Sequence, residues 1–555
     1  MTAPETAPRV RTGALAPLNH PVFRAVWITS LVTNFGGLIQ SVGAAWMMTS
    51  IASPQMVALV QASVSLPIMM LSLAAGALAD TVDRRRIMLA AQSFMLLVSA
   101  GLAAMTWMGW ITPWVLLSFT FLIGCGAAFN GPAWQASVGD MVPREDLAGA
   151  VTLNSMGFNL ARSVGPAIGG MIVAAAGAAA AFAVNAFSYV GLLIVLFRWK
   201  PDRPKQALPR EGLLAAMAGG LRYAFLSPRV TAVLLRAVVF GVGASAVQAL
   251  MPLVAREGGG GPLVFGLLLG AFGVGAVGGA LFVGKLRAKY ETETIVRVAG
   301  LTFAAAAAVI GYSPWLILTL PALMITGAGW VLVLSTFNVT VQMSVPRWIV
   351  ARALALYQMA AFGGMAGGSW LWGSMAQHQG LDVALGLSGG VLLLSVLIGL
   401  RVPLPSTANL NMDLLSRWTE PSTEVAIEPR SGPIVVTIAY QIREQDIDAF
   451  LEVMDERRRI RRRDGARQWH LLRDLAEPNT WIERYHTPTW LDYVRHNQRI
   501  TKADAETSER IRALHQGPGK PVVHRMIERT TVPLSADLHG PREITEPLTD
   551  PTRAS

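Results

Sequence analysis

Twelve long apolar runs follow one another between residues 22 and 400, and short polar breaks separate most of them. About 20 apolar residues in a helix cross the hydrocarbon core of a bilayer. Because lipid offers no hydrogen-bond partners to peptide groups, such runs must form helices. The sequence therefore predicts an all-α membrane protein with twelve transmembrane helices in two six-helix halves. The expected spans are Val22–Met48, Met56–Ala79, Ile87–Met108, Pro113–Ala136, Ala148–Ala176, Ala178–Phe197, Val230–Ala255, Pro262–Gly284, Thr294–Tyr312, Trp315–Met343, Ala351–Ala376 and Val383–Leu400.

The basic residues between the runs fall almost entirely on one side of the membrane, and the other side receives Arg256. Loops rich in Lys and Arg stay in the cytoplasm. We therefore expect both termini to be cytoplasmic, in a multi-pass protein of the cell inner (cytoplasmic) membrane. The residues on the cytoplasmic side are Arg84–Arg86, Arg144, Arg198, Lys200, Arg203, Lys205, Arg210, Lys285, Arg287, Lys289, Arg347 and Arg401.

Composition separates a membrane body from a soluble tail. The chain is 52% hydrophobic and 15% charged, and charge becomes dense only from Arg401 onward. The net charge of +11 is explained by membrane topology, so we expect no nucleic-acid partner. The single cysteine, Cys125, excludes an intrachain disulfide and a cysteine-rich metal site. The expected parts are a cytoplasmic N-terminal tail over 1–20, six-helix bundles over 21–198 and 230–400, linkers over 199–229 and 401–430, a soluble domain over 431–535 and a disordered tail over 536–555.

An internal repeat supports the division into two halves. A shift of 203 residues aligns Gly124, Gly126, Val142-Pro143-Arg144, Met156 and Gly165 with Gly327, Gly329, Val345-Pro346-Arg347, Met359 and Gly368. Parallel repeats of this kind are typical of transporters that move their halves around a site near the bilayer midplane. Between the halves, Gly212–Leu226 has apolar residues at helical spacing, which fits either a helix along the membrane surface or a plain linker.

The connection from Gly76 to Arg86 reads G-A-L-A-D-T-V-D-R-R-R between the second and third spans. Gly76 allows close helix approach, whereas Asp80 and Asp83 can accept hydrogen bonds at a helix end. The string resembles the loop signature of major facilitator superfamily transporters. The resemblance implies a cytoplasmic gate formed by Gly76, Asp80, Asp83, Arg84 and Arg85, although an ordinary positive-inside loop would also place arginines here.

The fifth span contains N-L-A-R-S-V-G-P-A-I-G-G from Asn159 to Gly170. Its Gly165, Pro166, Gly169 and Gly170 leave one face nearly without side chains, so the helix can bend and pack closely. The G-P-x-x-G-G core resembles the fifth-helix motif of exporters in the superfamily, although Ala161 stands where that motif usually has Gly. The resemblance favours export over import, and simple helix packing is the alternative.

Arg162 lies in the same span, about thirteen residues or roughly 20 Å from the cytoplasmic end. A cation at this depth should face the bundle interior or a wet cavity. Because no Asp or Glu falls inside a predicted span, Arg162 has no evident carboxylate partner. Two roles stay open: hydrogen bonds to carbonyls and to amides such as Asn154 or Asn159, or attraction of an anionic substrate. Arg236 lies nearer the cytoplasmic end, where it can extend to the interface.

Polar residues at mid-helix depth are candidates for a substrate cavity, although each also fits a helix-to-helix hydrogen bond. Arg162, Asn34, Asn130, Asn159 and Gln358 form the candidate group, with Gln40, Gln135, Asn185, Gln248 and Asn338 as further members and Trp46, Trp134 and Tyr357 as aromatic neighbours.

The tail alternates strand and helix patterns in the order βαββαβ, which predicts a small ferredoxin-like α+β domain. It resembles the α+β domains of the antibiotic-biosynthesis monooxygenase type. A redox or ligand pocket and a module for homodimerisation are the two readings, of which we favour the second. The expected elements are strands at Ile434–Ile442, Gln468–Arg473, Thr480–His486 and Val522–Glu528 and helices at Glu444–Arg463 and Thr489–His515. The candidate pocket residues are Trp469, His470, Trp481, His486, Trp490, His496 and His524.

Taken together, the segments Ala128–Ala136, Asn154–Pro166 and Arg461–Trp469 resemble the enterobactin-exporter-like permeases, also called transmembrane secretion effectors. The resemblance implies a secondary active transporter that exports a siderophore-like or drug-like small molecule by alternating access. We expect no catalytic residue, no metal and no cofactor. The competing hypothesis is a membrane-anchored enzyme whose tail oxidises or binds a small molecule.

Overall fold

A computed structural model describes residues 15–143, 146–200, 213–346, 349–405 and 420–529. The chain divides into two compact units, Met1–Asp413 and Leu414–Ser555. The predicted segment 536–555, most of the N-terminal tail, and Arg144 and Arg347 lie outside the described residues.

The first half of the membrane unit contains five continuous helical elements that make six spans. Gly177 lies inside α5 with φ 79° and ψ 175°, a backbone conformation that glycine adopts readily. It divides α5 into two helices, so the predicted break at this residue is confirmed. The elements are η1 (Ala16–Asn19), α1 (Pro21–Ile51), α2 (Pro54–Thr81), α3 (Arg84–Trp107), α4 (Pro113–Ser137), η2 (Val138–Asp140) and α5 (Leu147–Arg198).

The second half follows a short helix, α6 (Leu213–Leu226), and contributes six more spans. In the described residues, ten helices are long and apolar enough to cross a membrane, with α5 counted once. The less apolar α11 packs among them, so the predicted total of twelve spans is confirmed. The elements are α7 (Pro228–Glu257), α8 (Pro262–Lys289), α9 (Thr292–Tyr312), α10 (Leu316–Met343), α11 (Val350–Gln379) and α12 (Leu381–Arg401).

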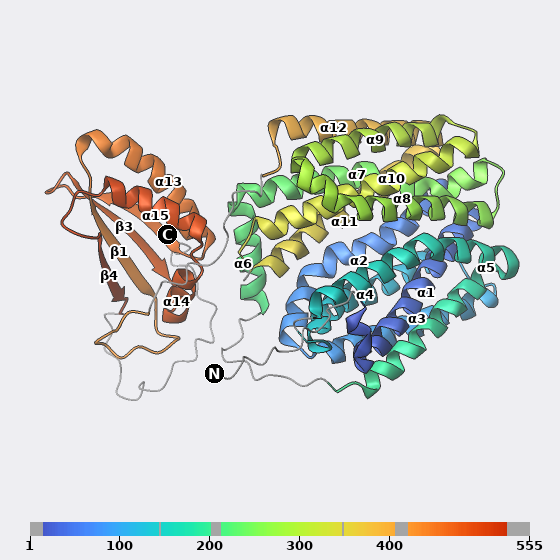
Figure 1. Cartoon of the computed structure of the whole chain (residues 1–555), viewed down its shortest axis with the longest axis horizontal. Coiled ribbons are helices and arrows are strands. Elements are labelled where there is room, and N and C mark those ends of the chain that lie inside the picture. The colour runs from blue at the N-terminus through green and yellow to red at the C-terminus, as the bar shows by residue number, and fades with distance from the viewer. Residues whose placement is uncertain (1–14, 144–145, 201–212, 347–348, 406–419, 530–555) are drawn as a thin grey trace, which may run out of the picture. The chain divides into compact units, whose positions relative to one another are not determined.

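The two halves contact each other mainly through α2 with α11 and α5 with α8 (Figure 1). Glycines bring α5 and α8 together, because a Cβ at Gly266 would lie 2.8 Å from the carbonyl oxygen of Pro166. Along α2 and α11, Gly373 faces Ala58 near one end of the bundle, and the Ser72 hydroxyl donates to the carbonyl of Ala355 toward the other.

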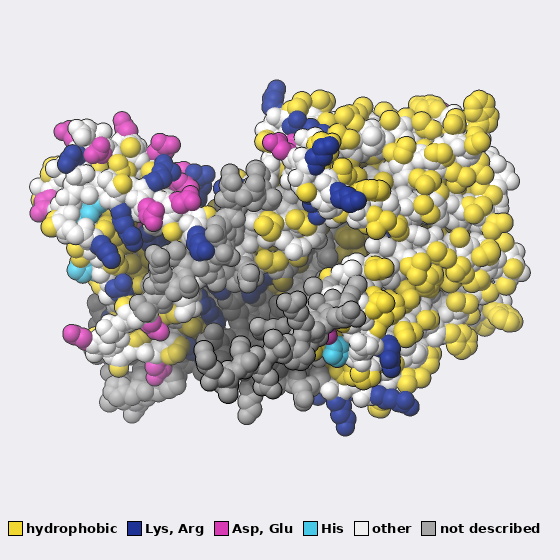
Figure 2. All heavy atoms as spheres, viewed as in Figure 1, with side chains coloured by type: hydrophobic (Ala, Val, Ile, Leu, Met, Phe, Trp, Pro, Cys, Tyr) yellow, Lys and Arg dark blue, Asp and Glu magenta, His cyan; other side chains and the backbone are white. Residues whose placement is uncertain are grey.

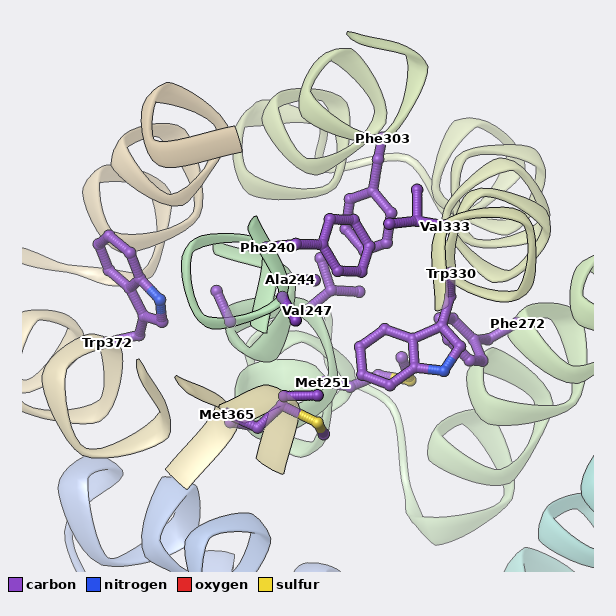
Figure 3. Packing of buried hydrophobic residues seen from close by; sticks show 14 of the residues in the cluster. Phe240, Ala244, Val247, Met251, Phe272, Phe303, Trp330, Val333, Met365 and Trp372 are labelled. Carbon is purple, nitrogen blue, oxygen red and sulfur yellow. The ribbon is translucent and has the colours of Figure 1, made fainter. Parts of the chain in front are cut away.

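The bundle has two distinct ends. We call the end where α2 meets α3 the Arg84 end, and the end where α7 meets α8 the Arg256 end. Lys and Arg side chains gather at the Arg84 end, around the last turn of α12 and along the opposite edge of the same end, whereas apolar side chains cover most of the rest of the visible lateral surface (Figure 2). The core of the second half is aromatic: Phe240 lies 5.8 Å from Phe303 and 6.1 Å from Trp330 between ring centroids (Figure 3).

The soluble unit has a four-stranded antiparallel sheet in the order β2-β3-β1-β4. This order confirms the ferredoxin-like prediction. The single helix predicted over Thr489–His515 is wrong, since Thr501 caps a second helix through a reciprocal bond pair with Asp504. The elements are β1 (Ile434–Gln441), η3 (Glu444–Asp446), α13 (Ile447–Arg463), β2 (Arg467–Arg473), β3 (Thr480–Thr487), α14 (Trp490–Gln498), α15 (Lys502–Leu514) and β4 (Val522–Ile527).

Candidate functional site

The loop between α2 and α3 is held by contacts within the first half. Asp83 caps α3 by accepting from the Arg85 amide at 2.9 Å. Arg84 donates to the Ala136 carbonyl and pairs with Asp140 at 3.0 Å. Arg85 donates to the carbonyls of Leu196 and Phe197, each at 2.7 Å. These arginines therefore tie α3 to the ends of α4 and α5, while the side chain of Asp80 lies outside those described.

Gly76 does not bring two helices into close contact. Within the described residues, nothing lies within 4 Å of the position that a Cβ would occupy there. Instead Gly76 lines a small cleft between α2, α6 and α11, with an interior space of about 10 Å³. That space holds roughly one water molecule, so the cleft is too small for a cargo molecule. Its lining residues are Leu73, Gly76, Ala77, Met217, Ala351, Arg352 and Ala355.

The glycines of the fifth span pack α5 against two neighbours at once. Cβ atoms at Gly165 and Gly169 would approach Leu38 and Ile39 of α1 at 3.1 Å. A Cβ at Gly170 would lie 2.7 Å from the Pro262 carbonyl oxygen of α8. Helix α5 keeps helical geometry through Pro166 and departs from it only at Gly177. The motif therefore acts in close packing, on one side within the first half and on the other between the halves.

Arg162 extends from α5 to two aromatic rings of the second half. Its guanidinium carbon lies 5.4 Å from the Phe272 centroid and 5.9 Å from the Trp330 centroid. Among the described residues its side chain makes no ion pair and no hydrogen bond, so the bonds to Asn154 or Asn159 that one of its two open roles required are not seen. A half-buried cation therefore lies at the boundary between the halves, with only ring faces as partners. Sequence reasoning missed both rings, because apolar mid-helix positions look alike whether they face a core or a cavity.

The predicted role of Arg236 is wrong. Arg236 does not extend to the interface: its side chain has 0% exposure and pairs with Glu293 at 3.2 Å. Glu293 also binds Arg297 at 2.9 Å and accepts from the Leu404 amide at 2.9 Å. The predicted ninth span began at Thr294, one residue too late to include this buried acid. The chain after α12 is thus fastened to α7 and α9 by an ion cluster.

The polar cavity candidates divide into two groups. Asn130 accepts from Gln92 across α3 and α4 at 3.1 Å. Gln40 and Asn185 belong to a buried network with Ser99 between α1, α3 and α5, so these residues join helices of the first half. Half-buried candidates with no hydrogen bond from their side chains in the described structure are Asn34, Asn159, Gln248 and Gln358.

The candidate pocket of the soluble unit does not assemble. Neighbouring residues of a strand point to opposite faces, so Trp481 lies under the helices while His486, like His524 of β4, lies on the uncovered face. His496 is buried under the helices against Arg461, at 2.7 Å. The seven aromatics and histidines therefore occupy both faces of one sheet and cannot form a single pocket.

Beneath these helices lies a buried ion cluster around Glu483. Arg461 donates to Glu483 at 3.1 Å, and Tyr440 donates to it at 2.8 Å. Burial alone would raise the pKa of Glu483, but the nearby Arg457 and Arg461 outweigh it and lower the pKa to about 2. Burial, reinforced by the charge of Arg461, lowers the pKa of His496 to about 3. The acid is therefore charged and the imidazole neutral at pH 7, which is a stable structural arrangement.

Residues 12–531 match the family model described as "Transmembrane secretion effector". The "Enterobactin exporter EntS" of Escherichia coli O1:K1 / APEC is 27% identical over 400 residues, which cover 69% of this chain and 93% of that protein. The "Uncharacterized MFS-type transporter YfiS" of Bacillus subtilis (strain 168) is 26% identical over 367 residues, covering 63% of this chain and 85% of that protein.

Solved transporter structures share the fold of the membrane unit. A bacterial homolog of the human lysosomal transporter Spinster, in an inward-facing and unoccupied conformation, superposes with a TM-score of 0.54 at 13% identity, covering 69% of this chain and 95% of that one. A D-xylose-proton symporter gives a TM-score of 0.57 at 13% identity, with 70% and 98% coverage. At this identity the likeness establishes the fold alone.

Proposed function

Because this chain belongs to the transmembrane secretion effector family of major facilitator transporters, we propose that it exports a small molecule across the cytoplasmic membrane by alternating access. Its two halves form a multi-pass membrane protein of the kind that transports small molecules. The cargo is siderophore-like or drug-like, by analogy with the enterobactin exporters that it resembles. Both termini and the Arg84 end lie in the cytoplasm, which the basic residues gathered at that end support.

One observation carries this proposal: Arg162 lies at the boundary between the halves, and none of the described acidic residues pairs with it. A charge at mid-membrane depth is costly and marks a substrate or ion pathway. The first half supplies the charge and the second half supplies Phe272 and Trp330, so a molecule bound here contacts both moving parts. Asn34, Asn159 and Gln358 belong to the proposed cavity as polar residues available for contact. We assign Asn130 to its edge, since Gln92 already engages it.

The contacts between the halves favour an arrangement that is closed at the Arg256 end. Arg256 donates from α7 to the carbonyl of Thr49 near the end of α1. Trp46 stacks on Phe265 at 6.2 Å, again joining α1 to the second half. Release of cargo requires these contacts to break. At the opposite end, the proposed gate comprises Gly76, Asp80, Asp83, Arg84 and Arg85, whose arginines hold α3 to its own half while the halves separate.

Everted membrane vesicles test the function. In such vesicles the cytoplasmic face points outward, so an exporter accumulates cargo inside. We expect accumulation of at least one member of a panel of siderophores and drugs, abolished by a protonophore if the proton gradient drives it. The matched control is vesicles that contain Arg162→Gln at equal abundance. Absence of accumulation across the whole panel would contradict export.

For the soluble unit we propose homodimerisation through the uncovered face of its sheet. Helices α13, α14 and α15 cover one face, and the strand registers place Val522, Ala439, Ile482 and Leu472 in one apolar row across the other. Val522 is 55% exposed and Leu472 is 45% exposed. Sedimentation of the full chain in detergent tests this: Ile482→Glu should convert a dimer to a monomer, and a monomeric parent would contradict the proposal.

A further inference from the structure

We infer that Arg162, Phe272 and Trp330 form a recognition site for aromatic carboxylates. The site would hold a flat ring that carries an ionised carboxylate, in preference to a neutral phenol, an amide or a cation. This inference rests on the proposed export function. It names the class of cargo that the proposed cavity binds, and it adds Phe272 and Trp330 of the second half to the residues that bind it.

The geometry places a cation and two ring faces at one point of the boundary between the halves. Phe272 and Trp330 lie 6.2 Å apart with an interplanar angle of 65°, and the Arg162 guanidinium lies over both. Gly273 makes this approach possible, since a Cβ there would lie 2.6 Å from the Ser163 Cα atom and the Arg162 carbonyl oxygen. The backbone of α8 therefore lies directly against α5 where the rings meet the guanidinium.

The rings are held in place by their surroundings. Trp330 is 5% exposed and packs against Phe240 (Figure 3). Phe240 in turn packs edge-on against Phe337 at 6.3 Å. Rigid aromatic side chains lose little conformational entropy when a ligand stacks on them. The rings are held rigidly, but Phe272 is only 3% exposed and the Arg162 guanidinium lies over it, so a flat partner reaches the rings when that side chain moves aside.

The charge of Arg162 is incompletely compensated. Ring faces attract a guanidinium, but a carboxylate accepts two parallel N–H bonds from it and is the stronger partner. The buried acid of the described membrane unit is engaged elsewhere: Glu293 pairs with Arg236 and Arg297. An incoming carboxylate therefore supplies the negative charge that no described residue offers to Arg162.

One ligand class fits both the cation and the ring faces of the site. Its carboxylate pairs with Arg162, and its ring stacks where the guanidinium now lies, against Phe272 and Trp330. A cation would be repelled by Arg162, and a neutral phenol would leave its charge unpaired. Because the ligand bridges α5 to α8 and α10, its binding also draws the halves together around it.

Matched probes test the charge requirement. Binding of 1-naphthoate, 1-naphthamide and 1-naphthylmethylammonium to the full chain in lipid nanodiscs is measured by titration calorimetry. We expect the carboxylate to bind about tenfold more tightly than the amide, as one charge-assisted pair implies, and the ammonium to bind least. Equal affinities for carboxylate and amide in the parent protein would overturn the inference without any variant.

Three variants locate the preference. Arg162→Gln should reduce the carboxylate-to-amide ratio to about one, and Arg162→Lys should keep a ratio above one. Trp330→Leu should weaken both probes by a similar factor. Trp315→Leu is the matched aromatic control, because Trp315 is 64% exposed at the start of α10. A ratio that survives Arg162→Gln would assign recognition to another cation and overturn the inference.

The outcome separates this inference from the proposed function. If vesicles export other molecules but the parent shows no carboxylate preference, the export proposal stands and the recognition site is wrong. If the preference and its loss in Arg162→Gln are measured but no vesicle transport is found, the recognition site stands and export is contradicted.

Discussion

In each half of the membrane unit, an arginine of the third span donates a hydrogen bond to a backbone carbonyl of the sixth span, but the residues around this contact differ between the halves. In the first half Arg85 donates to the carbonyl of Leu196, and in the second half Arg297 donates to the carbonyl of Gly399. The two acceptors are 203 residues apart, which is the shift of the sequence repeat. The repeat therefore preserves a contact between the third and sixth spans of each half, even where the residues differ.

The difference lies in what surrounds that contact. In the second half Glu293 binds Arg297 and the buried Arg236, and it also holds the Leu404 amide of the chain that leaves α12. In the first half the Arg85 side chain binds two carbonyls and, among the described residues, no acid. A side chain fits at Leu196, whereas a Cβ at Gly399 would lie 2.2 Å from Glu293 Oε1. We conclude that a buried ion cluster stabilises the second half at the Arg84 end, whereas weaker contacts near the surface stabilise the first half there.

Glu293→Gln should have the largest effect. It leaves Arg236 buried without a counter-ion, which costs about 3–5 kcal/mol for a broken buried pair. We expect a large fall in the thermal midpoint of the detergent-solubilised protein. Glu291→Gln is the control, since Glu291 is exposed at the start of the same helix and its side chain makes no cap bond. Equal thermal midpoints for the two variants would contradict stabilisation by the Glu293 ion cluster.

A fall in pH should lower the free energy of unfolding of the soluble unit, which contains a second buried ion cluster around Glu483. His496 titrates near pH 6.5 when unfolded and near 3 when folded, so protonation of the unfolded chain destabilises the fold as the pH falls below 6.5. Glu483, lowered from 4.5 to about 2, adds a loss as the pH falls below 4.5. Between pH 7.5 and 4.5, His496 alone should cost about 2–3 kcal/mol.

The fragment 420–529 allows this dependence to be measured by urea unfolding at the two pH values. His496→Gln should remove most of the loss between pH 6.5 and 4.5, because glutamine does not titrate. A parent fragment that is equally stable at both pH values would refute the assignment.

Gly399→Ala should destabilise the second half by about 1–3 kcal/mol, the usual cost of overpacking. The added methyl group would displace Glu293 and Arg236 from each other. Gly390→Ala in the same helix is the control, because nothing lies within 4 Å of that Cβ position among the described residues. Equal thermal midpoints for the two variants would show that the space around the ion cluster is not tight.

Arg85→Ala should have the smallest effect, about 1–2 kcal/mol, since it removes two hydrogen bonds from a charged donor to carbonyls near the surface. Arg86→Ala should change the midpoint by less, because Arg86 is 82% exposed and lies 3.9 Å from Asp83. If Arg85→Ala lowered the thermal midpoint as much as Glu293→Gln, the contacts of the two halves would be equally stabilising, and the proposed difference between the halves would be wrong.

The sequence was sufficient for the spans because bilayer thickness imposes a length on every apolar run. It also predicted the break at Gly177, where glycine alone among the neighbouring small residues favours a positive φ. In the soluble unit, strand periodicity and helix patterns predicted the ferredoxin-like order. The break at Thr501 was missed, because a capping box inside a polar helix resembles ordinary helix sequence.

The site was less accessible from sequence. The depth of Arg162 followed from counting residues, but its partners Phe272 and Trp330 come from α8 and α10, and only packing reveals which apolar residues meet. Glu293 was excluded by one residue, because the edge of a span was drawn where apolarity begins. The close approach expected at Gly76 is absent, since a glycine in a loop motif does not specify which helix lies beside it.

Distances between the halves at both ends test the central claim, which is that they separate at the Arg256 end to release cargo. Spin labels replace Trp110 and Tyr312 at that end, or Val82 and Tyr290 at the Arg84 end, in a Cys125→Ala background, and double electron–electron resonance measures each pair in nanodiscs with and without a transmembrane proton gradient. We predict opposite changes, so that a longer 110–312 distance accompanies a shorter 82–290 distance. Distances that stay fixed, or that change in the same direction at both ends, would contradict alternating access.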